Sequence, residues 1–151
     1  MDIVLHVVGS GNTDKYKYLA NTLEIGNMII WHGQVNHEEV NNLMRQSDLF
    51  LFTSIMDATS TVVMEAIQNQ LPVICHDTCG FGTVVDESIG VKVPLSNPEQ
   101  SVRDFAAVIR SLYEDRNRLK ALSDNCKDRI KLFEWDYKAR TMVDIYRSVL
   151  A

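Results

Sequence analysis

Short apolar runs and helix-like amphipathic stretches alternate along residues 2–93 of the chain. The apolar runs predict buried parallel strands, because strands covered on both faces are nearly continuous in apolar residues. These strands are expected at residues 2–8, 28–32, 48–53, 72–76 and 91–93. The intervening stretches predict helices at residues 14–23, 38–46 and 61–69. The alternation predicts an α/β fold, with a Rossmann-like parallel sheet and helices on both faces.

Beyond Pro94 the pattern changes to helices alone. Asn97-Pro98 and Glu114-Asp115 mark the starts of two helices. Their apolar positions share one face of each helix and are Val102, Phe105, Ala106, Ile109 and Leu112 in the first, then Leu119, Leu122 and Cys126 in the second. A last stripe comprises Ala139, Met142, Val143, Tyr146 and Val149. It predicts a terminal helix over residues 136–151, which Trp135 and Tyr137 are expected to anchor.

Composition narrows the class of protein without naming a function. The 151 residues are enough for one domain over residues 1–151, which would bury roughly two-thirds of its unfolded surface. A net charge of −5 argues against nucleic acid as a partner. No apolar run has the length of a membrane span, and the start lacks the charge pattern of a signal peptide, so we expect a cytoplasmic protein.

The three cysteines, Cys75, Cys79 and Cys126, do not have the paired spacing of a metal site. We expect free thiols and no bound metal. His6 and His32 lie within predicted strands, where hydrogen-bonded structural histidines are expected rather than an acid or base.

Residues 54–77 carry the strongest chemical signal. Thr59, Ser60 and Thr61 begin a helix directly after an apolar strand, and the first-turn N–H groups of a helix can face an anion. The helix terminus adds roughly half a positive charge. Asp57 and Glu65 stand on either side of this helix start, and their carboxylates can accept hydrogen bonds from sugar hydroxyls. The alternative is that both carboxylates are ordinary solvated surface charges.

The same stretch resembles a known family. Asp57 is followed after seven residues by Glu65-Ala66-Ile67, and then by Leu71-Pro72-Val73-Ile74. Further matching segments follow in the family's order at residues 5–11, 30–35, 48–54, 80–86 and 89–94. This set is similar to the donor-binding half of the retaining, nucleotide-sugar-dependent GT-B glycosyltransferases, the group 1 glycosyl transferases. The resemblance covers nearly the whole chain and implies one half of a GT-B fold.

The resemblance implies a role for each matching residue. Glu65 would accept hydrogen bonds from the ribose hydroxyls, and Asp57 would contact the transferred sugar as the catalytic acid residue. The backbone around Ser60, Thr61 and Val62 would meet the diphosphate, and the turn Gly33-Gln34-Val35 would lie beside the base. Gly9, Gly11 and Gly80 would line the donor cleft. The donor would be a UDP- or GDP-linked sugar, bound as a substrate without a cofactor or a metal.

Three features depart from the family's pattern. Ala58-Thr59-Ser60 stands where the family usually has Gly-Phe-Gly. Asp57 stands where the family usually has glutamate, which shortens the side chain by one methylene. Gln70 stands where the family usually has glycine, so we expect the helix to end without its usual left-handed glycine.

Other features of the family lie outside the chain. The family has an upstream strand and helix that carry an arginine and a lysine, and before them an N-terminal acceptor domain. We therefore expect an excised or truncated portion that binds its donor weakly and has no turnover alone. The helix at 136–151 would cross to that missing domain, and the full-length enzyme could associate peripherally with a membrane.

The expected function is donor binding in a retaining glycosyltransferase of cell-surface polysaccharide or glycolipid synthesis. Two alternatives stay open: a non-catalytic nucleotide-binding module, and a domain of a non-hydrolysing nucleotide-sugar epimerase. Nicotinamide binding is disfavoured, since Gly9-Ser10-Gly11 has Asp14 where a dinucleotide fingerprint has its third glycine.

Overall fold

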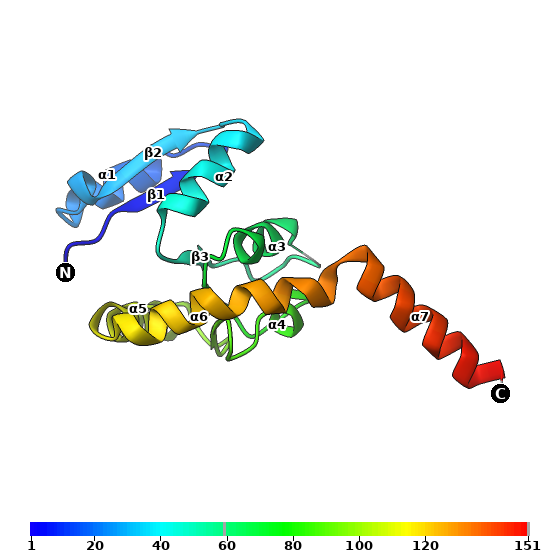
Figure 1. The fold of residues 1–151 in the computed structure, drawn as a ribbon. Helices are drawn as coiled ribbons and strands as arrows, with labels where there is room; N and C mark the ends of the chain where they lie inside the picture. The colour runs from blue at the N-terminus through cyan, green and yellow to red at the C-terminus, as the bar shows by residue number, and fades with distance from the viewer. Residues whose placement is uncertain (59, 151) are drawn as a thin grey trace. The chain divides into compact units, whose positions relative to one another are not determined.

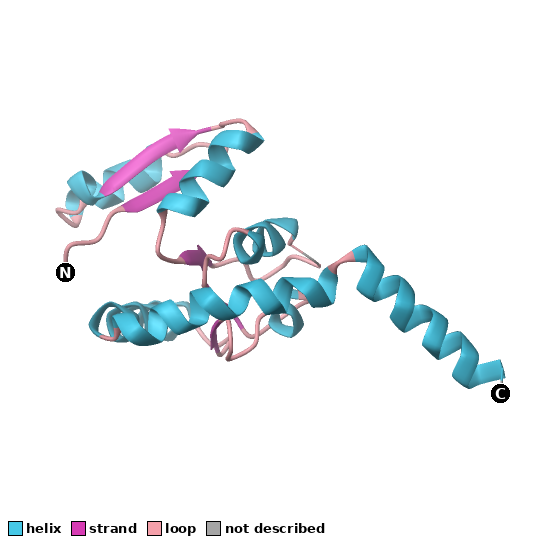
Figure 2. Cartoon of the chain, in the orientation of Figure 1, coloured by secondary structure: helices cyan, strands magenta, loops and turns pink. Residues whose placement is uncertain are grey.

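The computed structural model describes residues 1–58 and 60–150 and divides the chain into two compact units, Met1–Gln46 and Ser47–Ala151 (Figure 1). In both units parallel strands alternate with helices, as Figure 2 shows by colour. The α/β class predicted from the sequence is confirmed. The expected single domain over residues 1–151 stays a prediction, and the two units are treated separately below.

The first unit is built on a pair of parallel strands. Its elements are β1 (Leu5–Val8), α1 (Asp14–Thr22), the 3-10 turn η1 (Gly26–Met28), β2 (Ile29–Gly33) and α2 (His37–Gln46). Strand β1 begins three residues later than the apolar run suggested, because pairing with β2 starts at Leu5 opposite Ile29. The two histidines are hydrogen-bonded, as expected: His6 Nδ1 lies 2.9 Å from His32 Nε2.

The second unit holds a three-stranded parallel sheet in the order β3-β4-β5. Its strands are β3 (Phe50–Phe52), β4 (Val73–His76) and β5 (Gly90–Val93), linked by α3 (Thr61–Gln68) and the short α4 (Phe81–Val84). The sequence predicted one parallel sheet, whereas the strands form a two-stranded and a three-stranded sheet. Among the described strands, β3 pairs with β4 alone.

Helices cover both faces of the three-stranded sheet. Side chains alternate along β4, so its residues pack against both layers of helices. Ile74 packs with residues of α5 (Pro98–Glu114) and α6 (Arg116–Arg129). The opposite face meets α4, where the rings of Phe52 and Phe81 are 5.1 Å apart and edge to face. Strand β4 is buried at every position, which suits its apolar residues Val73, Ile74 and Cys75; His76 is its one polar residue.

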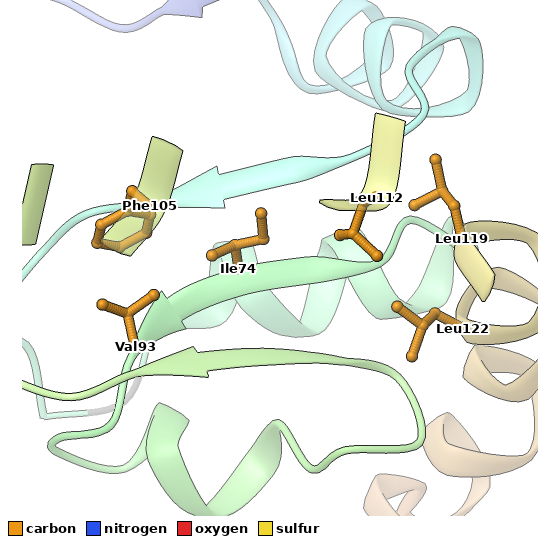
Figure 3. Packing of buried hydrophobic residues seen from close by; sticks show 6 residues of the cluster. All are labelled: Ile74, Val93, Phe105, Leu112, Leu119 and Leu122. Carbon is orange, nitrogen blue, oxygen red and sulfur yellow. The ribbon is translucent and has the colours of Figure 1, made fainter. Parts of the chain in front are cut away.

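One apolar cluster forms the core of the second unit, and Figure 3 shows its six side chains gathered along β4. They come from two strands and two helices and are Ile74, Val93, Phe105, Leu112, Leu119 and Leu122. Of the apolar positions predicted for the two helical faces, Phe105, Leu112, Leu119 and Leu122 fill this core and Ile109 packs against it. The prediction is wrong for Val102 and Ala106, which are exposed. Burial of each side chain of the cluster stabilises the fold by about 1.5–3 kcal/mol.

The helix starts expected at residues 97–98 and 114–115 are confirmed. Asn97 Oδ1 accepts a hydrogen bond of 2.9 Å from the N–H of Gln100, and Pro98 occupies the first helical position of α5. Asp115 Oδ1 accepts one of the same length from the N–H of Arg118 at the start of α6. These side chains satisfy N–H groups that a helix start would otherwise leave unpaired.

After the 3-10 turn η2 (Ile130–Phe133) the chain continues into α7 (Trp135–Leu150), and no described residue of α7 is buried. The expectation that Trp135 and Tyr137 anchor this helix is wrong: they are 88% and 47% exposed. The apolar stripe of α7 has no packing partner within the described part of the chain that could bury it. Among the same residues, no helix combines the length and apolar character needed to span a bilayer.

The end of α3 shows how the chain manages without the family's glycine. Gln70 adopts the left-handed conformation itself, with φ of 59°. The N–H of Leu71 bonds to the carbonyl of Ala66 and that of Gln70 to Ile67, which is the Schellman pattern of a helix end. Ser123 Oγ also donates to the carbonyl of Gln70 at 2.8 Å. Helix α3 therefore ends in the usual Schellman geometry, but the left-handed position is occupied by Gln70, whose side chain makes that conformation strained.

We predict that Gln70→Gly stabilises the protein. Relief of the left-handed strain gives about 1–2 kcal/mol, and the extra freedom of glycine in the unfolded chain removes up to about 1 kcal/mol of it. The free energy of unfolding should rise by about 0.5–1 kcal/mol, measured by urea denaturation. Gln68→Gly, two residues earlier within α3, is the matched control and should lower stability. Equal losses from both substitutions would contradict the strain argument.

Candidate functional site

The start of α3 is open to an anion. Ser60 precedes the helix in an extended conformation, is 7% exposed, and its side chain makes no capping bond. Within the described part of the chain, no residue accepts a hydrogen bond from the N–H groups of Thr61 and Val62. The first helical turn thus keeps unpaired donors at the positive end of the helix dipole. Thr59, the first hydroxyl of the predicted cluster, lies outside the described residues.

The two faces of α3 have different roles. Val63, Ala66 and Ile67 are buried and fix the helix against the rest of the unit. The other face carries Thr61, Met64, Glu65 and Gln68, which line a groove of about 450 Å³. The opposite wall consists of Ile130, Phe133, Glu134 and Trp135, from η2 and the start of α7. Glu65 is half-buried in this groove.

Asp57 lies in a loop that contacts the loop following β4. The N–H of Gly80 donates to the carbonyl of Ala58 at 3.1 Å, and Cys79 Sγ donates to the carbonyl of Ile55 at 3.7 Å. The structure thus brings Asp57 and Gly80 into neighbouring loops. Gly80 is the residue that directly precedes α4. Its N–H is engaged by Ala58 and does not point freely into a cleft.

Arg129 binds the C-terminal end of α4. The guanidinium donates to the carbonyls of Thr83 and Val84, each at 3.0 Å, and forms an ion pair with Asp86 at 3.0 Å. Burial alone would favour the neutral form of Asp86. Hydrogen bonds from the hydroxyl and N–H of Ser88 and the positive charge of Arg129 outweigh it, so the pKa of Asp86 lies below its ordinary value.

The remaining predicted site residues belong to the first unit. Gly9, Gly11 and Gly33 all have positive φ, at 136°, 148° and 68°, which only glycine adopts readily. The N–H of Gly9 bonds to the carbonyl of Gly33 at 2.8 Å and so joins the loops that follow β1 and β2. Gln34 and Val35 follow in the second of these loops. The predicted residues therefore form two groups, one in each unit.

The cysteines behave as free thiols. Cys75 and Cys126 are buried, and burial raises the pKa of each to about 11. Cys79 is exposed. In the part of the chain that the structure describes, no three histidine, cysteine, aspartate or glutamate side chains lie close enough together to hold a metal ion.

Sequence reasoning missed the second wall of the groove. The spacing of Thr61, Glu65 and Gln68 at intervals of four and three residues was a usable signal for one helical face. Phe133 and Trp135 reach the same groove only through the packing of η2 beside α3. No sequence pattern links these distant segments, so the aromatic wall had to come from the structure.

Comparison with known proteins gives consistent matches. Residues 1–129 match the family described as glycosyl transferases group 1. The D-inositol 3-phosphate glycosyltransferase of Corynebacterium kroppenstedtii is 24% identical over 143 residues, which are 94% of this chain and 31% of that protein. The GPI3 subunit of the phosphatidylinositol N-acetylglucosaminyltransferase of Saccharomyces cerevisiae is 25% identical over 78% of this chain and 25% of its own length. The chain thus spans about a third or less of these curated relatives.

Two solved structures have the same fold. The pneumococcal O-GlcNAc transferase GtfA, in complex with UDP and GlcNAc, superposes with a TM-score of 0.79 at 24% identity, over 97% of this chain and 29% of that chain. WaaG, a glycosyltransferase involved in lipopolysaccharide biosynthesis, gives a TM-score of 0.73 at 24% identity, over 85% of this chain and 34% of its own.

The ion pair of Asp86 predicts a pH-dependent contribution to stability. Because the folded pKa is depressed, the contribution is complete above the unfolded pKa of about 3.9 and is lost as pH falls through the folded value. Asp86→Asn should therefore lower the free energy of unfolding by about 1 kcal/mol at pH 7, and the difference from the parent should shrink below about pH 4. Urea denaturation between pH 3 and pH 7 measures it. Glu87→Gln, a substitution at an exposed neighbour, should show no such trend. If the free energies of unfolding of Asp86→Asn and the parent differ by the same amount at every pH, the titration of Asp86 does not contribute to stability.

Proposed function

The chain belongs to the glycosyl transferases group 1 family, and on that premise we propose that it is the donor-binding part of a retaining glycosyltransferase. Its ligand would be a nucleoside diphosphate sugar, linked to UDP or GDP. The observation that carries the proposal is that Glu65 lines the same groove as Thr61, the first residue of α3, where the helix has unpaired N–H groups.

The spacing of these groups suits a nucleotide. Glu65 stands four residues after Thr61, so the carboxylate lies about 6 Å along the helix axis from the unpaired N–H groups. A diphosphate at the helix start would gain about 0.3–1 kcal/mol from the helix dipole, besides its hydrogen bonds. The attached ribose would then reach Glu65, and each charge-assisted hydrogen bond there contributes on the order of 1.5–3 kcal/mol.

The proposed chemistry is electrostatic. The amides of Ser60, Thr61 and Val62 would stabilise the negative charge that develops on the departing nucleoside diphosphate. Asp57, in the loop beside Gly80, would hold the hydroxyls of the transferred sugar while the acceptor attacks from the face that the diphosphate leaves. We propose no covalent intermediate on Asp57 and no metal.

The glycine loops of the first unit retain the roles that the resemblance implies. The turn Gly33-Gln34-Val35 would contact the edge of the base, and Gly9 and Gly11 would allow the backbone to approach the donor closely. Positive φ at all three glycines supports these roles, because residues with a side chain rarely adopt that backbone conformation.

The reaction of a complete enzyme is a further part of the proposal, because the chain spans about a third of its relatives. We propose that an acceptor-binding partner domain completes the site and that the chain alone has no turnover. The products would be cell-surface polysaccharides or glycolipids made in the cytoplasm. The involvement of the similar protein WaaG in lipopolysaccharide biosynthesis supports this choice of pathway.

Nucleotide titration tests the central claim. We expect isothermal titration with UDP, GDP and ADP to reveal binding of at least one nucleotide, and Glu65→Gln to weaken it by a factor of 10 or more, as loss of a charged hydrogen bond implies. Glu114→Gln, which makes the same charge change at the exposed end of α5, should leave the affinity unchanged. Absence of binding for all three nucleotides would instead favour a module without donor chemistry.

Asp57 should affect only ligands that carry a sugar. We predict that Asp57→Asn leaves the affinity for the free nucleoside diphosphate within about twofold and lowers the affinity for the corresponding nucleotide sugar by roughly 10-fold. Parallel titrations of the two ligands make the comparison. Equal losses for both ligands would show that Asp57 acts on the nucleotide or on the fold, and not on the transferred sugar.

A further inference from the structure

We propose that Lys92 is a positioning residue for Asp57 and acts through the loop that follows β4. The inference rests on the proposed function, since it concerns the carboxylate that would hold the transferred sugar. Lys92 lies on β5, where it pairs with Cys75 of β4. The roles that the family resemblance implies do not include this lysine.

A single ammonium group joins the two ends of the β4–α4 loop (residues 77–80). Lys92 Nζ lies 3.4 Å from Asp77 Oδ1, at the first residue of the loop, and donates to the carbonyl of Gly82 at 3.2 Å, within α4. Asp77 and Gly82 are also close to each other, because a Cβ atom at Gly82 would lie 3.1 Å from Asp77 Oδ1. An ammonium group has three donors, so it can hold both partners at once.

The β4–α4 loop in turn holds the segment that carries Asp57. Among the described residues 55–58, both hydrogen bonds to other segments are made with this loop. Gly80 donates to the carbonyl of Ala58, and Cys79 donates to the carbonyl of Ile55. Asp57 stands between these two contacts in the sequence and is half-buried. The position of Asp57 therefore depends on the loop, and that of the loop on Lys92.

The effect of Lys92 should be local. The side chain of Asp77 is 56% exposed, and an ion pair with an exposed partner adds little to overall stability. The side chain of Lys92 is only 24% exposed, so water replaces its contacts less readily than those of a surface lysine. Loss of the ammonium group should therefore loosen the loop without unfolding the unit, which urea denaturation verifies.

Parallel titrations of a nucleotide sugar and its free nucleoside diphosphate test the role. Lys92→Met removes the ammonium group and keeps the apolar stem. Its affinity for the diphosphate should stay within about twofold of the parent, and its affinity for the nucleotide sugar should fall by about 3-fold or more. Lys92→Arg keeps a positive charge and N–H donors, so it should restore most of the loss. When Asp57 is already asparagine, Lys92→Met should cause no further loss, because both residues act on one sugar contact.

Hydrogen exchange measured by NMR reports on the loop without any ligand. The N–H of Gly80 should exchange at least about 5-fold faster in Lys92→Met than in the parent, because the loop opens more often. Asp77→Asn weakens the same ion pair from the other side and should have a similar effect. Lys120→Met is the matched control, since it breaks an ion pair with Asp124 within α6. It should change neither the exchange rate nor the affinities.

The outcomes separate the two proposals. If exchange of the Gly80 N–H is unchanged in Lys92→Met, or if the two ligands lose affinity equally, Lys92 does not position Asp57. The proposed function then stands, provided that the parent binds the nucleotide. If the parent chain binds neither ligand, the proposed function fails and the role of Lys92 fails with it.

Discussion

Burial of β4 is the constraint on which the second unit depends. Its residues Val73 to His76 have no exposed side, so each must be matched by a packing partner on one of two helical layers. Ile74 meets the cluster of α5 and α6, and the other face is closed by α3 and α4. The orientation of α3 follows from this, because Val63, Ala66 and Ile67 must point inward. Only then do Thr61 and Glu65 face outward together.

The same burial has a cost at one position. His76 is 4% exposed, and its Nδ1 has no hydrogen-bond partner among the residues described. The imidazole packs edge-on against Phe105, with ring centres 4.9 Å apart. An unpaired buried nitrogen destabilises a fold by about 1–3 kcal/mol. The apolar contacts of β4 and α5 must offset this loss for the strand to stay in place.

The helices and strands were predictable from the sequence to within a few residues wherever the chain has a regular hydrophobic period or a helix-capping residue. Asn97 and Asp115 marked their helices correctly, because short polar side chains bond to the N–H groups that a helix start leaves free. The left-handed Gln70 was not predictable, since glutamine rarely adopts that conformation and only the surrounding hydrogen bonds hold it there. The exposure of Trp135 was missed for a related reason: an aromatic residue before a helix usually packs, and only tertiary structure shows that nothing covers it.

The contrast between the three thiols has a practical consequence. With pKa values of about 11, Cys75 and Cys126 carry almost no thiolate at neutral pH and are also shielded by the core. Cys79 alone is exposed among them, on the loop that contacts the segment around Asp57. A maleimide dye would therefore attach at one defined point, beside the proposed sugar position. The native sequence already supplies a spectroscopic probe of that loop, without any engineered cysteine.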